Sequence, residues 1–353
     1  MTPIRPLEEQ DLPKLAGLHH RVFQTKVSPH DPIYAEYLRD VFLEPAGETG
    51  LHSLVYVDEG EIAGFLGVVR RRMTFDASPV SAAVSSQFVV EPGARSGFVA
   101  LQLLRHFLDG PQDLSITDEA SDVSRHLWTK LGGATSFLHS VHWMLPLRPA
   151  RLAVSLLERR RFGGWARLLT PLAGAADAVA SRLKPHARGD GLRSEHLDLT
   201  ALPELASSFS PGLLRPEYDA ADLRRILLWA ERRQPGRLYK SLLRTEEGRP
   251  AGWYVFAREA NGSAEVLQVG AAETHLSDVL DRLALEAACS GCLCLTGRLE
   301  PALVHEISRR LCVIHPRRQW MLVHSRRPEL QGALERGDAF LSRLDGEWAI
   351  RFT

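Results

Sequence analysis

The sequence lacks any long apolar run, and it carries no excess of either charge. No stretch approaches the roughly 18 uninterrupted apolar residues that mark a membrane-spanning helix, so we expect none. Lys plus Arg and Asp plus Glu number 43 each, which gives a formal net charge of zero. Proteins that bind nucleic acids usually carry a basic excess, so we expect no nucleic-acid partner. The first residues, Met1–Pro6, also lack a basic segment followed by an apolar one, so we expect no cleaved signal and a cytoplasmic protein.

Cysteine is equally scarce. Four cysteines occur in 353 residues, all in the last quarter of the chain, and such a sequence does not depend on a disulfide framework. Thiolate clusters can bind zinc, but no second pair of Cys or His follows Cys292 and Cys294 at zinc-finger spacing. Free cysteine is commonly buried as a small apolar side chain. The sequence therefore predicts no metal site.

What the sequence does contain is a regular series of apolar patterns. Its length corresponds to about two domains of roughly 100–200 residues each. Apolar residues recur at helical spacing in some segments and form short strand-like runs in others. In the first 145 residues the expected elements are helices over 7–23, 32–43, 95–108 and 122–131, and strands over 52–57, 62–70, 79–90, 114–117 and 137–145.

The same order of elements recurs from Leu192 onward, although the residues differ. A short extended segment is followed by two helices, two strands around the turn 246–250, a third strand, and then helix, strand, helix and strand. An internal duplication explains this repetition. We therefore expect an α/β protein of the α+β kind, with one domain over 1–146 and a second over 191–353, each a mixed, mostly antiparallel sheet flanked by helices.

The segment 147–190 between the two halves is different. Between Arg148 and Arg188, nine basic residues stand against only Glu158 and Asp177, with leucines and a tryptophan interleaved. This pattern predicts a basic amphipathic helical linker that packs between domains and leaves its cationic face in water. The alternative is peripheral contact of 148–188 with an anionic membrane surface or an acidic partner.

The clearest local signal for function is the junction after the strand over 79–90. That strand ends at Val89 and Val90, and a loop of small residues leads directly into the next helix. The first amides of a helix have no partner within it and carry the positive end of its dipole, so they can hold a phosphate group. Arg95 lies in this loop, and its guanidinium group can donate two hydrogen bonds to phosphate oxygens.

This junction and the order of elements resemble the GNAT acyltransferase superfamily, over residues 1–145 and more distantly over 192–353. That family binds the diphosphate of coenzyme A on a loop of pattern Q/R-x-x-G-x-G/A between its fourth strand and the following helix. Arg95 matches the first position and Ala100 the last, whereas Phe98 stands at the usual glycine and Gly97 lies one residue early. Either the loop has a local deletion that keeps the amides, or diphosphate binding has weakened.

The resemblance implies an acetyl-CoA donor and a set of residues around it. The implied cofactor-binding residues are Val89, Val90, Arg95, Ser96, Gly97, Phe98, Val99 and Ala100.

The catalytic residues are less clear from the sequence. In many relatives a tyrosine after the fifth strand protonates the leaving thiolate, and here Trp128 holds that position. An indole has no proton to give in a useful range, so we expect Trp128 to be a core aromatic. Asp118 and Ser124 are candidate replacements near the end of the expected fifth strand, and Glu91 is a candidate base.

The second half lacks a comparable loop. After its third strand the chain reads Gly270 to His275, and Glu273 at the helix start would repel a phosphate. We therefore expect a single coenzyme A site and an acyl-CoA-dependent N-acyltransferase, in which a small-molecule or peptide amine attacks the thioester directly. The alternative is a non-catalytic scaffold or binding protein built on decayed GNAT folds.

Overall fold

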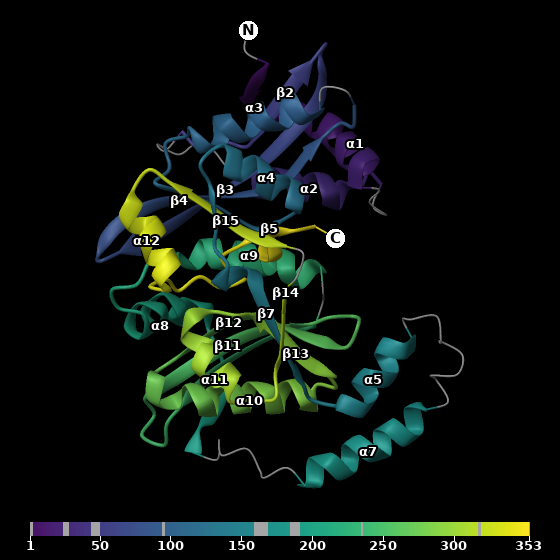
Figure 1. Ribbon diagram of the computed structural model, residues 1–353, viewed down its shortest axis with the longest axis vertical. Coiled ribbons are helices and arrows are strands. Elements are labelled where there is room, and N and C mark those ends of the chain that lie inside the picture. The colour runs from purple at the N-terminus through teal and green to yellow at the C-terminus, as the bar shows by residue number, and fades with distance from the viewer. Residues whose placement is uncertain are drawn as a thin grey trace. The chain divides into compact units, whose positions relative to one another are not determined.

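The structure, a computed structural model, contains two mostly antiparallel sheets flanked by helices (Figure 1), which confirms the expected fold class. It describes residues 3–23, 28–43, 50–93, 96–158, 169–183, 191–233, 236–316 and 319–352. The chain divides into two compact units. Unit 1 consists of Met1–Ser140, Ser210–Arg233 and Arg317–Thr353, and unit 2 of Val141–Phe209 and Gln234–Pro316. None of the described helices is long and apolar enough to cross a membrane.

Unit 1 is built mainly from the first part of the chain. Its elements there are β1 (Ile4–Pro6), α1 (Leu12–Phe23), α2 (Pro32–Phe42), β2 (Leu54–Asp58), β3 (Glu61–Phe75), β4 (Ser78–Val90), α3 (Ser96–Leu108), β5 (Leu114–Ala120), α4 (Asp122–Lys130) and β6 (Ala134–Thr135). Later segments add β9 (Arg215–Pro216), α9 (Ala220–Arg233), β15 (Trp320–Ser325), α12 (Pro328–Arg336) and α13 (Glu347–Ile350). Local signals explain several boundaries: α2, for example, starts where the Asp31 carboxylate accepts the amide of Ile33 at 2.8 Å.

The sheet of unit 1 runs in the order β1-β2-β3-β4-β5-β15-β6, with β9 beside β3. Among the strands that the structure describes in this sheet, β4 and β5 are the one parallel pair. The late strand β15 lies between β5 and β6, with Val323 opposite both Ile116 and Ala134. Helices α1 and α2 contribute to one core cluster around Phe65, and α3 and α4 contribute to another around Leu66 and Trp128. The side chains of Phe65 and Leu66, which are neighbours on β3, thus pack on opposite faces of the sheet, because successive side chains of a strand alternate between its faces.

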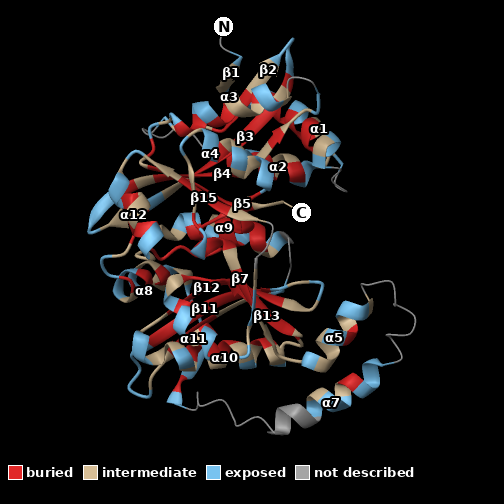
Figure 2. Cartoon of the chain, viewed as in Figure 1, coloured by how far each residue is buried: buried red, intermediate tan, exposed pale blue. Residues whose placement is uncertain are grey.

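Unit 2 has a second sheet in the order β14-β7-β13-β12-β11-β10-β8. Figure 2 shows its strands buried beneath helices such as α10. Its elements are β7 (Val141–Pro146), α5 (Pro149–Leu157), α7 (Thr170–Leu183), β8 (Arg193–His196), α8 (Leu202–Phe209), β10 (Leu238–Arg244), β11 (Pro250–Arg258), β12 (Ser263–Ala271), α10 (Leu276–Cys289), β13 (Cys294–Arg298), α11 (Val304–Ser308) and β14 (Val313–Pro316).

The two sheets exchange strands. β7 follows β6 along the chain, yet it pairs with β13 and β14 in unit 2. β15 belongs to the second half of the chain, yet it completes the sheet of unit 1. The compact units therefore differ from the consecutive segments 1–146 and 191–353, since unit 1 takes β9 and β15 from the second half of the chain and unit 2 takes β7 from the first.

The predicted helical linker is represented by α5 and α7 in unit 2. Val154 of α5 packs against Ala173 of α7. The Asp177 carboxylate accepts the first amides of α5, those of Ala150 at 2.9 Å and Arg151 at 3.0 Å. Asp177 of α7 thus caps the first turn of α5. Residues 159–168 and 184–190 of the linker lie outside the described residues.

Candidate functional site

The parallel strands β4 and β5 separate at their carboxyl ends. They pair only from Ala82–Leu114 to Val84–Ile116, although both strands continue further. β4 also carries a bulge, because its register with β3 shifts after Ser86 and Gln87 has a φ of 53°. A bulge bends a strand and re-aims its backbone groups. At this end of the sheet of unit 1 the two strands therefore no longer pair with each other, which leaves an opening between them.

The first turn of α3 lies directly after β4. The Ser96 amide and hydroxyl donate to the carbonyl of Gly93 at 3.1 and 2.8 Å, which fixes the turn into the helix. A Cβ atom built on Gly93 or Gly97 would meet nothing within 4 Å, so the backbone there is open to a ligand. The Phe98 side chain is 57% exposed, and it leaves the space over Gly97 free. The space beside Gly97 in the first turn of α3 is thus open, as an anion site at a helix start requires.

The other expected cofactor residues differ in their surroundings. Arg95 lies outside the described residues, so its role stays a prediction. Val89 and Val99 are buried in the core of unit 1, whereas Val90 and Ala100 are half-buried. A ligand on this turn would therefore meet Val99 through its main chain, because the side chain packs in the core beside Leu103.

A buried cluster of carboxylates occupies the end of β5. The side chain of Glu347, the first residue of α13, accepts the amides of Asp118 and Glu119 at 3.2 Å each and the hydroxyl of Thr117. In return, the Asp118 carboxylate accepts the amide of Glu347 at 2.6 Å. The amides of Asp118 and Glu119 lie beyond the last residues at which β4 pairs with β5, so Glu347 provides these amides with a hydrogen-bond acceptor. The C-terminal segment thus supplies a side chain to the opening between β4 and β5.

Gly346 permits this close approach. A Cβ atom at this position would lie 2.0 Å from Oδ2 of Asp118, so no larger residue fits without displacing the carboxylate. The same segment is anchored further along the chain, where the Tyr37 hydroxyl donates to the carbonyl of Ile350 at 2.7 Å and Phe352 packs against Tyr34 and Tyr37. The position of Glu347 is therefore fixed from both sides.

The electrostatics of this cluster are unusual. Burial, together with the neighbouring carboxylates of Asp118 and Glu119, raises the pKa of Glu347 to about 8. Glu119 is compensated by the buried Arg343 at 2.7 Å and by Arg351 at 3.6 Å. A carboxyl group that titrates near neutral pH can take up or release a proton during a reaction, which is a common property of catalytic sites.

The three catalytic candidates from the sequence have different surroundings. Asp118 is buried within the cluster around Glu347. Ser124 lies in the first turn of α4, where its hydroxyl is 3.2 Å from that of Ser121. Glu91 forms an ion pair with Arg21 at 2.6 Å, and both side chains are substantially exposed. The structure thus brings only Asp118 into contact with Glu347.

Trp128 and Glu347 illustrate what the sequence can and cannot signal. Trp128 is 1% exposed and packs against Phe107, which confirms the expectation of a core aromatic. Glu347 is a functional candidate that the sequence analysis missed. It lies 229 residues from Asp118, and no spacing motif connects the two.

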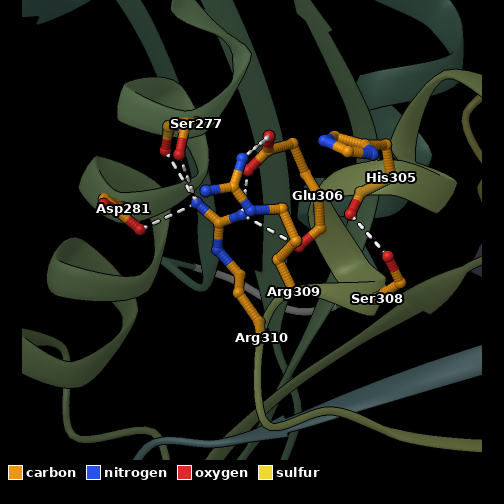
Figure 3. Close-up of polar contacts among 7 residues, drawn as sticks. All are labelled: Ser277, Asp281, His305, Glu306, Ser308, Arg309 and Arg310. Carbon is orange, nitrogen blue, oxygen red and sulfur yellow. Dashed lines mark hydrogen bonds and ion pairs between the residues drawn. The ribbon is translucent and has the colours of Figure 1, made fainter.

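Unit 2 has a different arrangement at the start of its corresponding helix, α10. Arg310 joins the first turns of α10 to α11 (Figure 3): one guanidinium nitrogen donates to the carbonyl of Ser277 at 3.0 Å and to Asp281 at 2.9 Å, and the other contacts Glu306. Arg309 reaches Glu306 only at 4.0 Å and is 69% exposed. The polar groups at this corner are engaged with one another, so the expectation of a single donor site in unit 1 stays in place.

Comparisons with known proteins support the architecture. No protein-family model and no curated protein matches the chain. Among solved structures, a probable N-acyltransferase from Enterococcus faecalis aligns over 93% of this chain and 73% of its own, with a TM-score of 0.61 and 9% identity. A GCN5-related N-acetyltransferase from Anabaena variabilis aligns over 90% and 71%, with a TM-score of 0.59 and 16% identity.

A third solved structure is similar in fold. N-myristoyltransferase from Saccharomyces cerevisiae, solved with bound myristoyl-CoA, aligns over 97% of this chain and 84% of its own, with a TM-score of 0.52 and 10% identity. At identities this low, the similarity establishes the fold alone. Together with the opening between β4 and β5, these matches show that the chain has the fold of the GCN5-related N-acetyltransferase (GNAT) superfamily.

Proposed function

We propose that the protein is an acyl-CoA-dependent N-acyltransferase with its donor site in unit 1. The observation that carries the proposal is the open first turn of α3 beside the separated ends of β4 and β5. The solved structures with the same fold are described as N-acyltransferases and N-acetyltransferases, and one holds myristoyl-CoA. The diphosphate of the donor would bind the amides of Gly97 and Phe98, with Arg95 adding a charge, and its acyl thioester would lie between β4 and β5. Acetyl-CoA is the donor we propose.

The chemistry needs one proton acceptor. When an amine attacks the thioester, a C–N bond forms, the C–S bond breaks with the thiolate leaving, and the nitrogen loses a proton. We assign that proton to Glu347, whose pKa of about 8 is matched to the task and whose carboxylate lies at the opening. Thr117 and the amide of Asp118 hold this carboxylate in place. Positioning of the two substrates supplies much of the remaining acceleration.

Donor binding can be tested at Gly97. We expect Gly97→Glu to abolish binding of acetyl-CoA, because it adds a negative charge where the diphosphate would bind. The neutral variant Gly97→Gln is the matched control, and it should retain binding. Both side chains enter open space, and an acidic residue in the first helical turn is slightly stabilising, so both variants should fold.

The measurement is isothermal titration with acetyl-CoA at millimolar concentration. Loss of binding in the glutamate variant alone supports the proposal. No binding by the unmodified protein, or equal binding by both variants, would contradict it.

A non-catalytic binding protein is the second candidate function. It is favoured by the core position of Trp128 at the usual tyrosine and by the surface ion pair of Glu91. Thiol release from acetyl-CoA, followed across a panel of small-molecule and peptide amines, separates the two candidates. Binding without any turnover supports this second function, whereas turnover that is lost in Glu347→Gln excludes it.

Peripheral membrane contact through 148–188 remains a proposal of its own, supported by the exposed side chains of Leu156 and Leu172 on α5 and α7. Flotation with anionic vesicles tests it, and absence of the protein from the lipid fraction would exclude it.

A further inference from the structure

A cavity of 440 Å³ in unit 1 is lined by four arginines. Arg70, Arg71 and Arg72 come from β3, and Arg225 comes from α9. The volume lies within the range of roughly 300–1,000 Å³ that small-molecule sites usually have. The cavity is distinct from the α3 turn and from the cluster around Glu347, since none of those residues lines it.

The cavity occurs where an edge of β3 changes partner. Pairing with β2 ends at Leu66, and pairing with β9 begins at Met73. On its other edge the same stretch of β3 stays paired with β4, where Arg72 lies opposite Ser81. The chain after β9 then crosses this interval, and the Glu217 amide donates to the carbonyl of Arg72 at 2.9 Å. Regular, hydrogen-bonded elements therefore frame the cavity, which is a preformed feature of unit 1.

The charges that face the cavity favour an anion. Four guanidinium groups line it together with two carboxylates, those of Glu217 and Asp222. Outside the lining, Arg72 bonds Asp219 at 3.0 Å and Arg71 donates to the carbonyl of Asp345 at 3.3 Å, so the lining itself keeps four positive groups against two negative ones. The pair between Arg225 and Asp222 is long, at 3.6 Å, and the Asp222 side chain is 54% exposed, so an incoming anion can replace this partner.

The remaining lining is partly apolar. Met73 and Val80 are buried and form part of a core cluster beneath the arginines. A ligand that matches both surfaces has an apolar body and one oxyanion. Guanidinium groups bind carboxylate and phosphate oxygens in pairs, with a geometry that water and lysine do not reproduce. We propose that this cavity binds a small organic oxyanion, a carboxylate or a phosphate monoester, at a site separate from the acyl donor.

The test uses three probes of similar size: phenyl phosphate, benzoate and the neutral benzyl alcohol. Binding to the unmodified full chain is measured by ligand-observed NMR. We expect both anions to bind and benzyl alcohol to bind at least tenfold more weakly. Stronger binding of phenyl phosphate would indicate that the site prefers a phosphate group. Stronger binding of benzoate would indicate that it prefers a carboxylate.

Variants assign the binding to the cavity. Arg70→Gln and Arg225→Gln, made separately, should each weaken the anions about tenfold. The matched control is Arg336→Gln, which removes an exposed arginine on α12 and should leave binding unchanged. Equal binding of all three probes to the unmodified protein would overturn the proposal without any variant. Equal effects of Arg70→Gln and Arg336→Gln would also overturn it, since the anions would then bind through general surface charge.

Discussion

Replacing Glu347 by glutamine should make the protein more stable at neutral pH while reducing its activity. In the folded protein the pKa of Glu347 is raised from 4.5 to about 8, chiefly by burial. The folded state therefore holds a proton that the unfolded state has lost between these two values. Because the native state binds more protons there, the free energy of unfolding falls as the pH rises from about 4.5 to about 8.

The magnitude follows from the size of the shift. At about 1.4 kcal/mol for each pKa unit, the loss of stability from this group is about 3 kcal/mol at pH 7 and approaches about 5 kcal/mol above pH 8. Glutamine keeps an oxygen that can accept from Thr117 and from the amides of Asp118 and Glu119, but it does not ionise.

Urea unfolding at pH 5, 6, 7 and 8 measures this effect. We expect Glu347→Gln and the unmodified protein to differ little at pH 5, and the variant to be more stable by a few kcal/mol at pH 8. The exposed Glu329→Gln is the matched control, and it should show no such divergence. A stability difference between Glu347→Gln and the unmodified protein that is the same at every pH would refute the argument, because it would mean that Glu347 has the same pKa in the folded and unfolded states.

Two further changes test the packing and the ion-pair network. Gly346→Ala should destabilise unit 1 by about 1–3 kcal/mol, because its Cβ would clash with Asp118, whereas Gly93→Ala enters open space and should have little effect in the same thermal unfolding assay. Arg310→Gln should destabilise unit 2 by about 1.5–3 kcal/mol, because it leaves Asp281 and Glu306 without their shared partner. The neighbouring Arg309→Gln should change stability by less than about 0.5 kcal/mol, since that side chain is exposed, and equal effects at the two arginines would contradict this account of the network.

The sequence predicts most elements of the fold because apolar periodicity is a local property. It places strands over 62–70 and 79–90, and the structure extends the first of these, β3, to Phe75. The difference arises at the turn, where Asp76 and Ala77 both adopt positive φ angles of 48° and 61°. Such two-residue hairpin turns usually contain glycine, and its absence hides the turn from sequence analysis.

Strand exchange could not be predicted for a related reason. The apolar pattern predicts a strand over 137–145, where the structure has a short 3-10 turn at Leu138–Ser140 followed by β7, but the pattern carries no information on which sheet receives that strand. The same limit applies to the site. The turn into α3, where we propose that the diphosphate binds, is contiguous in sequence and can be found from it, whereas Asp118 and Glu347 meet only through tertiary structure. A single glutamate near the end of a chain has no pattern that separates it from a surface residue.

The exchange of β7 and β15 has a consequence for synthesis on the ribosome. When residues 1–146 have been translated, the edge of β5 still lacks its neighbour, because β15 is made some 170 residues later. The nascent chain meanwhile carries β7, whose own sheet is not yet translated. An open strand edge invites pairing with other chains. Each sheet therefore reaches its complete set of strands only after both halves of the chain have been translated.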